Sequence, residues 1–177
     1  MKGIIINILE ATVIDAFDED TWDDMIDAAD VDGHYTSLGN YDDAEVIALI
    51  TALPAETGAD LPERLRWFGT MAAPQLASRF PAFFEGHDLR SVLPTLNHVI
   101  HPEVRKLYPG ANPPVFDVGD GAELVLTYHS DRGLCHLAEG FVLGTAACLG
   151  EVITVSQSTC IHRGDATCDI VITWATE

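Results

Sequence analysis

The sequence is poor in positive charge and contains no long apolar run. Only nine of its 177 residues are lysine or arginine, against 28 acidic residues, so the formal net charge at pH 7 is −19. Such a chain repels nucleic acid and anionic membrane surfaces. No segment approaches the ~20 consecutive apolar residues of a membrane-spanning helix, and the opening Met1-Lys2-Gly3 leads into an acid-bearing segment unlike a signal peptide. We therefore expect a cytoplasmic protein that binds neither nucleic acid nor membrane.

Cysteine is also scarce. The four cysteines are Cys135, Cys148, Cys160 and Cys168, and in a reducing compartment they are poor candidates for a disulfide framework. We therefore consider metal binding and simple burial first as roles for these cysteines. The 47% hydrophobic content of a chain of this length suffices for one sizeable core but not for two comfortable domains. We expect residues 1–177 to form a single domain.

Apolar residues recur at helical spacing through the first two-thirds of the chain. We expect helices over residues 4–17, 22–29, 46–53 and 62–76. The last three should be capped at their starts by Asp20-Thr21, by Tyr41-Asp42, and by Asp60 or Leu61, respectively. The later chain predicts a hairpin with a turn at Gly119-Asp120-Gly121 before a strand over 123–128, a helix over 133–149, and an antiparallel pair over 152–156 and 168–173. The fold class is α+β, with a helical N-terminal part joined to an antiparallel sheet crossed by helices.

Two histidines, His98 and His101, lie three residues apart in a segment that ends in Tyr108-Pro109-Gly110. Imidazole is a common ligand of haem iron, and a helix holds it at a fixed angle to the porphyrin. A helical histidine taken alone is more often a surface or core residue. Pro102 directly follows His101, which predicts either a kinked helix or a new helix that begins there.

A second motif is Tyr128-x-Ser130-x-Arg132 at the end of the expected strand. Strand alternation places the three side chains on one side, and arginine grips a carboxylate with two parallel hydrogen bonds. The motif indicates a site for an anionic group. A polar face on an edge strand is the simpler alternative.

Together these segments resemble the H-NOX (haem nitric oxide/oxygen binding) family, known as bacterial stand-alone proteins and as part of soluble guanylate cyclase. The resemblance covers essentially the whole chain, including its opening Met-Lys-Gly-Ile-Ile, Phe80-Pro81, the Phe-Glu-Gly at 84–86 and Pro113-Pro114. It implies a b-type haem between the helical part and the sheet. It further implies that His101 rather than His98 is the iron ligand, that Tyr128, Ser130 and Arg132 clasp the propionates, and that Pro114 distorts the porphyrin.

The resemblance also bears on which gas is bound. In H-NOX members that keep oxygen, a tyrosine lies five residues after the triplet's arginine, and here that residue is Leu137. Bound oxygen needs a hydrogen-bond donor on the distal side, whereas nitric oxide does not. The other residues expected to line that side also lack a donor: Ile5, Leu9, Ala72, Ala73, Leu76 and Phe141. We predict a sensor of nitric oxide that also binds carbon monoxide.

The family further implies how the signal leaves the domain. Nitric oxide would break the His101–iron bond and free its helix, and a separate histidine kinase or cyclic-di-GMP enzyme would carry the output. We see no residues placed to cleave peroxide and no substrate site, so the sequence does not indicate an enzyme.

A last cluster comprises Cys160, His162 and Cys168, to which Cys135 adds a fourth ligand. A Cys₃His set is typical of structural zinc, and some bacterial H-NOX proteins are similar here, which implies zinc. Burial as small hydrophobic residues is the competing interpretation. Zinc-bound thiolates can also be oxidised, so the site could report redox state. We expect Cys148 to lie in the core.

The principal alternative is an oxygen-storing or haem-using enzyme. A second alternative is a zinc-containing ligand-binding or redox-sensing module of the four-vinyl-reductase type. Such a module shares a Cys-rich C-terminal hairpin but needs neither the haem-ligand histidine nor the Tyr-x-Ser-x-Arg triplet.

Overall fold

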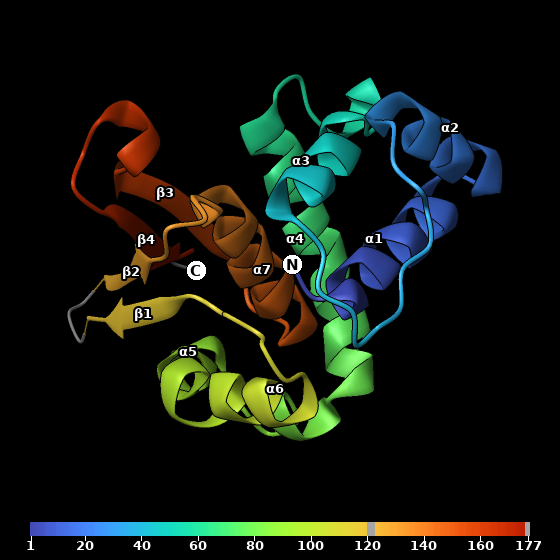
Figure 1. The fold of residues 1–177 in the computed structure, drawn as a ribbon. Helices are drawn as coiled ribbons and strands as arrows, with labels where there is room; N and C mark the ends of the chain where they lie inside the picture. Colours follow the sequence, from blue (N-terminus) through green and yellow to red (C-terminus); the bar gives the residue numbers. More distant parts are fainter. Residues whose placement is uncertain (120–122, 176–177) are drawn as a thin grey trace.

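The structure is a computed structural model that describes residues 1–119 and 123–175. Helices fill the first two-thirds of the chain, and a four-stranded sheet crossed by one further helix follows (Figure 1). The helices are α1 Gly3–Ala16, α2 Glu19–Ala29, α3 Asp43–Thr51, α4 Leu61–Arg79, α5 Leu89–Thr95, α6 His101–Leu107 and α7 Cys135–Cys148. The strands are β1 Val115–Val118, β2 Leu124–His129, β3 Ile153–Thr159 and β4 Cys168–Trp174. The α+β class is confirmed.

The predicted helices are present, but their ends differ. The N-cap of α2 is Asp18, whose carboxylate accepts a hydrogen bond from the Thr21 amide at 2.8 Å, so the expected start at Asp20-Thr21 is wrong. Glu19 and Asp20 instead occupy the first turn, where negative charge suits the positive end of the helix dipole. Asp60 caps α4, which runs past the expected end at residue 76 to Arg79.

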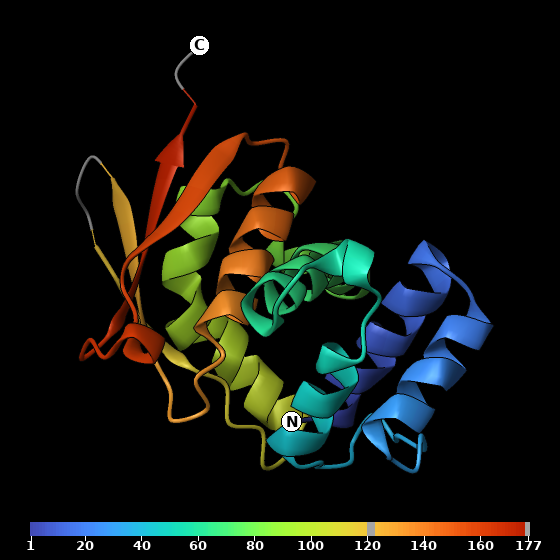
Figure 2. The same cartoon turned by 90° about the horizontal axis from the view of Figure 1, so that it is seen from above.

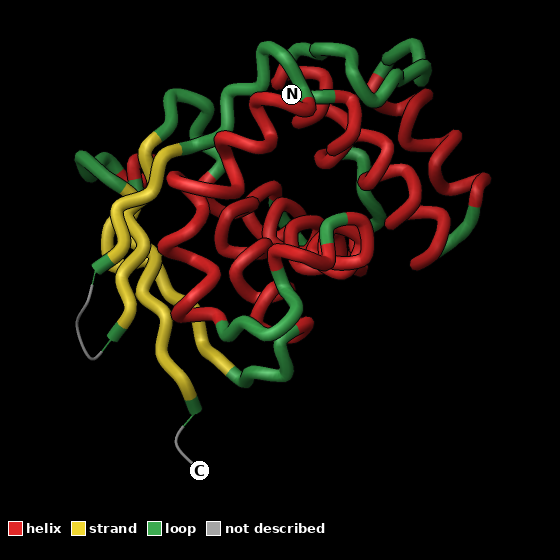
Figure 3. The backbone as a smooth tube through the Cα atoms, turned by 90° about the horizontal axis from the view of Figure 1, so that it is seen from below, coloured by secondary structure: helices red, strands yellow, loops and turns green. Residues whose placement is uncertain are grey.

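All strands are antiparallel in the order β1-β2-β4-β3. The β1–β2 hairpin is confirmed, with Phe116 opposite Tyr128, although residues 120 and 121 of its expected turn lie outside the described residues. The pairing of Tyr128 with Cys168 joins β2 to β4. The two expected strand pairs therefore form one continuous sheet, seen edge-on beside the helices in Figure 3.

Helix α7 lies between the sheet and α4 (Figure 2). A Cβ atom added at Gly140 would lie 2.2 Å from the Arg66 carbonyl oxygen, and one at Gly69 would lie 2.5 Å from that of Leu137. The backbones of the two helices are therefore in direct contact, because glycine at both positions leaves no side chain between them.

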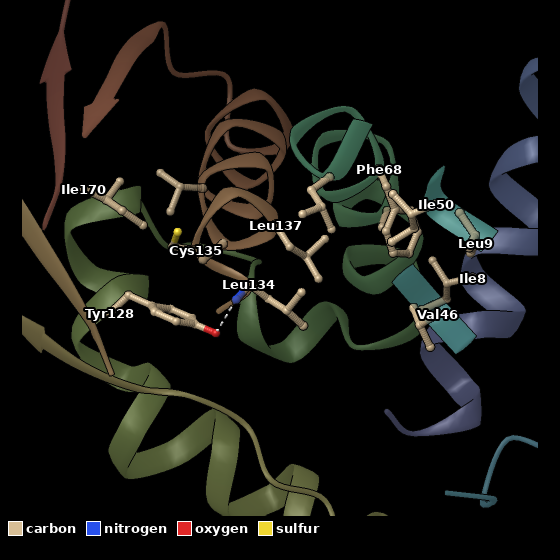
Figure 4. Packing of buried hydrophobic residues seen from close by; sticks show 14 of the residues in the cluster. Ile8, Leu9, Val46, Ile50, Phe68, Tyr128, Leu134, Cys135, Leu137 and Ile170 are labelled. Carbon is tan, nitrogen blue, oxygen red and sulfur yellow. Dashed lines mark hydrogen bonds between the residues drawn. The ribbon is translucent and has the colours of Figure 1, made fainter. Parts of the chain in front are cut away.

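One hydrophobic core runs from α1 through α4 and α7 to the sheet. Figure 4 shows Leu137 directed toward Phe68, and Ile170 and Tyr128 on the sheet side of α7. Among the described residues, no helix combines the length and apolar character needed to cross a membrane.

Candidate functional site

A cavity of about 480 Å³ lies between α6, the start of β1, and helices α1, α4 and α7. Its size is in the range that proteins use for small ligands and cofactors. Apolar side chains from both halves of the fold form most of its walls, among them Ile4, Ile5, Leu76, Val104, Phe116 and Phe141. Polar groups enter at His101, at Tyr128 and Arg132, and near the N-terminus at Asp43.

His101 is the first residue of α6 and lines this cavity, while His98 is exposed. Pro102 occupies the first turn of α6. The preceding residues, Leu96–Ile100, form a π-helical turn. Leu96 and Ile100 both have helical backbone angles, so the helical path continues from α5 through this turn into α6, and the π-helical turn is the irregularity that precedes Pro102.

The imidazole of His101 is held in its neutral form. Burial, followed by the nearby charge of Arg105, lowers its pKa to about 4, against a smaller opposing effect of the Pro114 backbone. Its Nδ1 is buried and has no hydrogen bond of normal geometry to any of the described residues. Neutral imidazole is the form that coordinates a metal, and a buried polar atom without a partner is unusual. The residue is therefore suited to a ligand that enters the cavity.

Tyr128 and Arg132 line the cavity, whereas Ser130 is not among the described residues that line it. Strand β2 ends at His129, so Ser130 and Arg132 lie in the turn that follows. Ser130 Oγ accepts a hydrogen bond from the Arg132 amide at 3.3 Å, and the Tyr128 hydroxyl accepts one from the Leu134 amide at 3.1 Å. Burial raises the pKa of the Tyr128 phenol, and its hydrogen bond with Ser130 opposes that shift.

Arg132 also has a partner that sequence reasoning missed. Its Nε and Nη2 donate to the two carboxylate oxygens of Asp43 at 2.6 and 2.7 Å, and the N-terminal ammonium of Met1 donates to the same carboxylate at 2.8 Å. Burial alone would raise the pKa of Asp43, but hydrogen bonds and charge from these two cations outweigh it and lower the pKa. No local pattern marks Asp43, because its partners lie at the N-terminus and 89 residues along the chain.

The residues expected on the distal side divide into two groups. Ile5, Leu76, Leu137 and Phe141 line the cavity, whereas Leu9, Ala72 and Ala73 are fully buried and are not among the described residues that line it. Pro114 also lines the cavity, and its backbone lies near His101. Thr145 of α7 adds a hydroxyl to the lining that the sequence analysis did not include.

Comparison with known proteins identifies the family to which this chain belongs. Residues 2–157 match the Haem-NO-binding family. The chain belongs to this family, the H-NOX domains. It is similar to a crystal structure of an H-NOX protein from S. oneidensis in the Fe(II)NO ligation state, with a TM-score of 0.90, 28% identity, and coverage of 99% of this chain and 100% of that one.

Two further structures agree. An NMR structure of the Shewanella oneidensis H-NOX domain in the Fe(II)CO state gives a TM-score of 0.86 at 29% identity, covering all of both chains. The unliganded Fe(II) H-NOX protein from K. algicida gives 0.84 at 26% identity, covering 100% of this chain and 98% of that one. The resemblance drawn from the sequence motifs is thereby confirmed.

The H-NOX domain also carries a cluster of buried thiols between α7 and the sheet. The Sγ atoms of Cys135 and Cys160 are 3.8 Å apart, and those of Cys160 and Cys168 are 4.0 Å apart. Burial raises the pKa of Cys135 to about 12 and also raises that of Cys168. Both thiols are therefore protonated at neutral pH, and a bound metal would have to displace their protons.

Two histidines lie beside these thiols, and their rings stack 5.8 Å apart. His162, the expected ligand, is exposed, and its Nε2 lies 2.7 Å from the Gly133 carbonyl oxygen. His136 was not singled out, yet it offers a ring nitrogen within 4.8 Å of the sulfurs of both Cys135 and Cys160. Cys148 is exposed, so its expected place in the core is wrong. It is the last residue of α7, where the helix leaves the packed interior.

Proposed function

We propose that this H-NOX domain binds b-type haem through His101 and senses nitric oxide. The single observation that carries the proposal is the half-buried, neutral imidazole of His101, which lines a largely apolar cavity and whose Nδ1 has no hydrogen bond of normal geometry among the described residues. Bound haem iron would supply a coordination position for a diatomic gas. Relatives from S. oneidensis have been solved with nitric oxide and with carbon monoxide, and this chain is expected to bind both.

Residues in and beside the cavity would orient the haem. Tyr128, Ser130 and Arg132 would receive the propionates, since a guanidinium beside two hydroxyls suits carboxylates. Arg132 is positioned for this by its two hydrogen bonds with Asp43. Pro114, whose backbone lies near His101, would press against the porphyrin.

The gas preference follows from Leu137, which contributes an alkyl side chain to the cavity at the position where a tyrosine would stabilise bound oxygen. The domain would then form no lasting oxygen complex in air.

The signal would leave through α6. When nitric oxide binds, His101 would lose its bond to iron, and α6 would move about the π-helical turn at Leu96–Ile100. We propose that a separate cytoplasmic histidine kinase or cyclic-di-GMP enzyme receives this movement and that the domain has no catalytic activity of its own.

We also propose that the thiol cluster holds a structural zinc ion. Three buried thiols with two adjacent imidazoles have the donor chemistry that zinc prefers. Oxidation of these thiols would release the ion, so the site could report redox state as well. A zinc module without haem is the alternative function, and it differs by having no Soret band.

Absorption spectra of the ferrous protein under vacuum, in air and with nitric oxide test the proposal. We expect a Soret band, no oxy spectrum in air, and a five-coordinate nitrosyl spectrum. His101→Gly should lose haem and regain it with added imidazole, while the exposed control His98→Gly should retain it. A His101→Gly protein that keeps its haem and its colour regardless of imidazole contradicts the proposal.

A further inference from the structure

We infer that His136, and not His162, is the imidazole ligand of the zinc ion, and that Glu139 and Arg66 hold it in position. The inference rests on the proposed zinc site and concerns which residues build it. It is independent of the haem.

The sulfur positions already match a metal site. A tetrahedral zinc ion with Zn–S bonds of about 2.3 Å separates its sulfurs by about 3.8 Å. The Cys135–Cys160 and Cys160–Cys168 sulfur distances are 3.8 and 4.0 Å. Each of these two pairs thus has the spacing of two sulfur ligands on one ion, with Cys160 common to both. Three thiolates on a tetrahedral ion would leave one coordination position to fill.

His136 is better placed than His162 to fill that position. A ring nitrogen of His136 lies within 4.8 Å of the Cys135 and Cys160 sulfurs, so a small shift brings all of them onto one ion. His162 is exposed, and its Nε2 is engaged by the Gly133 carbonyl at 2.7 Å. His162 would have to break that hydrogen bond and turn inward to coordinate the same ion.

A carboxylate also fixes the orientation of the His136 ring. Nδ1 of His136 lies 2.9 Å from Oε2 of Glu139, and the Glu139 side chain is only 3% exposed. Histidines that bind metals usually donate their second ring N–H to such a carboxylate. With Nδ1 donating to Glu139, the lone pair of Nε2 remains for the zinc ion.

Arg66 completes the arrangement from the neighbouring helix. Its Nε and Nη2 donate to the same Glu139 oxygen at 3.1 and 2.8 Å, which compensates the charge of a carboxylate that is otherwise almost fully buried. Because Arg66 is on α4 and Glu139 is on α7, the chain of contacts runs from the metal site to the two helices that wall the cavity. Figure 4 shows Cys135 and Leu137 leaving α7 on different sides, the first toward the sheet and the second toward α4.

Metal analysis of the full-length protein purified without chelator tests the assignment. The wild type and His162→Ala should contain one zinc ion per chain, while His136→Ala should lose it. Glu139→Gln should weaken zinc binding by about 10- to 100-fold, as removal of such a supporting partner does elsewhere. His162→Ala losing zinc while His136→Ala retains it would overturn the inference.

Cobalt substitution covers the case in which His136→Ala does not fold. His136→Cys keeps four possible ligands and should bind Co²⁺ with a stronger sulfur-to-metal absorption than the wild type, since a thiolate replaces an imidazole. An unchanged cobalt spectrum would place residue 136 outside the coordination shell. A wild type without zinc also overturns the inference, whereas the nitrosyl spectrum of the same sample reports separately on haem sensing.

Discussion

Lys2 and Pro109 join the N-terminus to the end of the helix that begins with His101: the Lys2 ammonium donates a hydrogen bond to the Pro109 carbonyl oxygen at 2.9 Å. The same ammonium donates to the Leu38 carbonyl and to the side chain of Asn40 at 2.8 and 2.9 Å. Lys2 is only 7% exposed, and these acceptors use all three of its donors. Movement of α6 therefore has a direct polar connection to α1, whose residues Ile4 and Ile5 line the cavity.

Replacing Lys2 with methionine should destabilise the protein. The substitution keeps much of the side chain's length but removes three hydrogen bonds donated by a buried ammonium, and a hydrogen bond to a charged group contributes about 1.5–3 kcal/mol. Urea unfolding would measure this loss. Lys106→Met is the matched control, because Lys106 is 69% exposed and pairs with Glu103, and an exposed pair of this kind contributes ~0.5 kcal/mol. Equal effects of the two substitutions would contradict a structural role for the Lys2 contacts.

Replacing Leu137 with tyrosine should allow the ferrous protein to hold oxygen. Leu137 lines the cavity, and a phenol there would donate a hydrogen bond to the partly negative bound oxygen. Absorption spectra in air measure the effect. Leu137→Phe supplies the same ring without the hydroxyl and should leave the protein without an oxy spectrum. If both variants bound oxygen, cavity shape rather than hydrogen bonding would govern the choice of gas.

The Asp43 carboxylate should make the free energy of unfolding depend on pH in the acid range. Its pKa is lowered in the folded protein by Arg132 and the Met1 ammonium, against the effect of burial. The stabilisation is therefore fully present above the unfolded pKa of about 3.9 and is lost as the pH falls through the lower folded value. The wild type should exceed Asp43→Asn in unfolding free energy at pH 7, and the difference should shrink below about pH 4. Since the Asp43 side chain is 31% exposed, solvent screening keeps the effect modest. A difference that stays constant down to pH 3 would show that the Asp43 charge is not responsible.

The sequence predicted what is encoded locally and missed what long-range packing creates. Helical spacing and the motifs around His101 and Tyr128 are continuous segments, so they could be read directly and compared with a family. The Asp43–Arg132 pair and the approach of His136 to Cys160 join residues far apart in the chain, and no periodicity signals such contacts. His162 attracted attention because it is close to Cys160 in sequence, yet the fold brings His136 nearer to the thiols.

The contact between α4 and α7 provides a prediction in which two effects of one methyl group oppose each other. In a helix interior, alanine is about 1 kcal/mol more favourable than glycine, so Gly140→Ala would be stabilising if there were space. The added Cβ would instead lie 2.2 Å from the Arg66 carbonyl oxygen and 2.9 Å from Cα of Gly69. Backbone atoms cannot rotate away, so the helices must separate, and overpacking of this kind costs about 1–3 kcal/mol.

We therefore expect Gly140→Ala to lower the free energy of unfolding measured in urea. Gly119→Ala is the control, since the nearest neighbour of its added Cβ would be 3.6 Å away, and its stability should stay close to that of the wild type. The cavity supplies a second readout: because Leu137 and Phe141 flank Gly140 and line the cavity, separation of the helices should also shift the absorption band of bound haem. A stabilised Gly140→Ala protein would mean that helix propensity outweighs packing and that the two helices do not need their close contact.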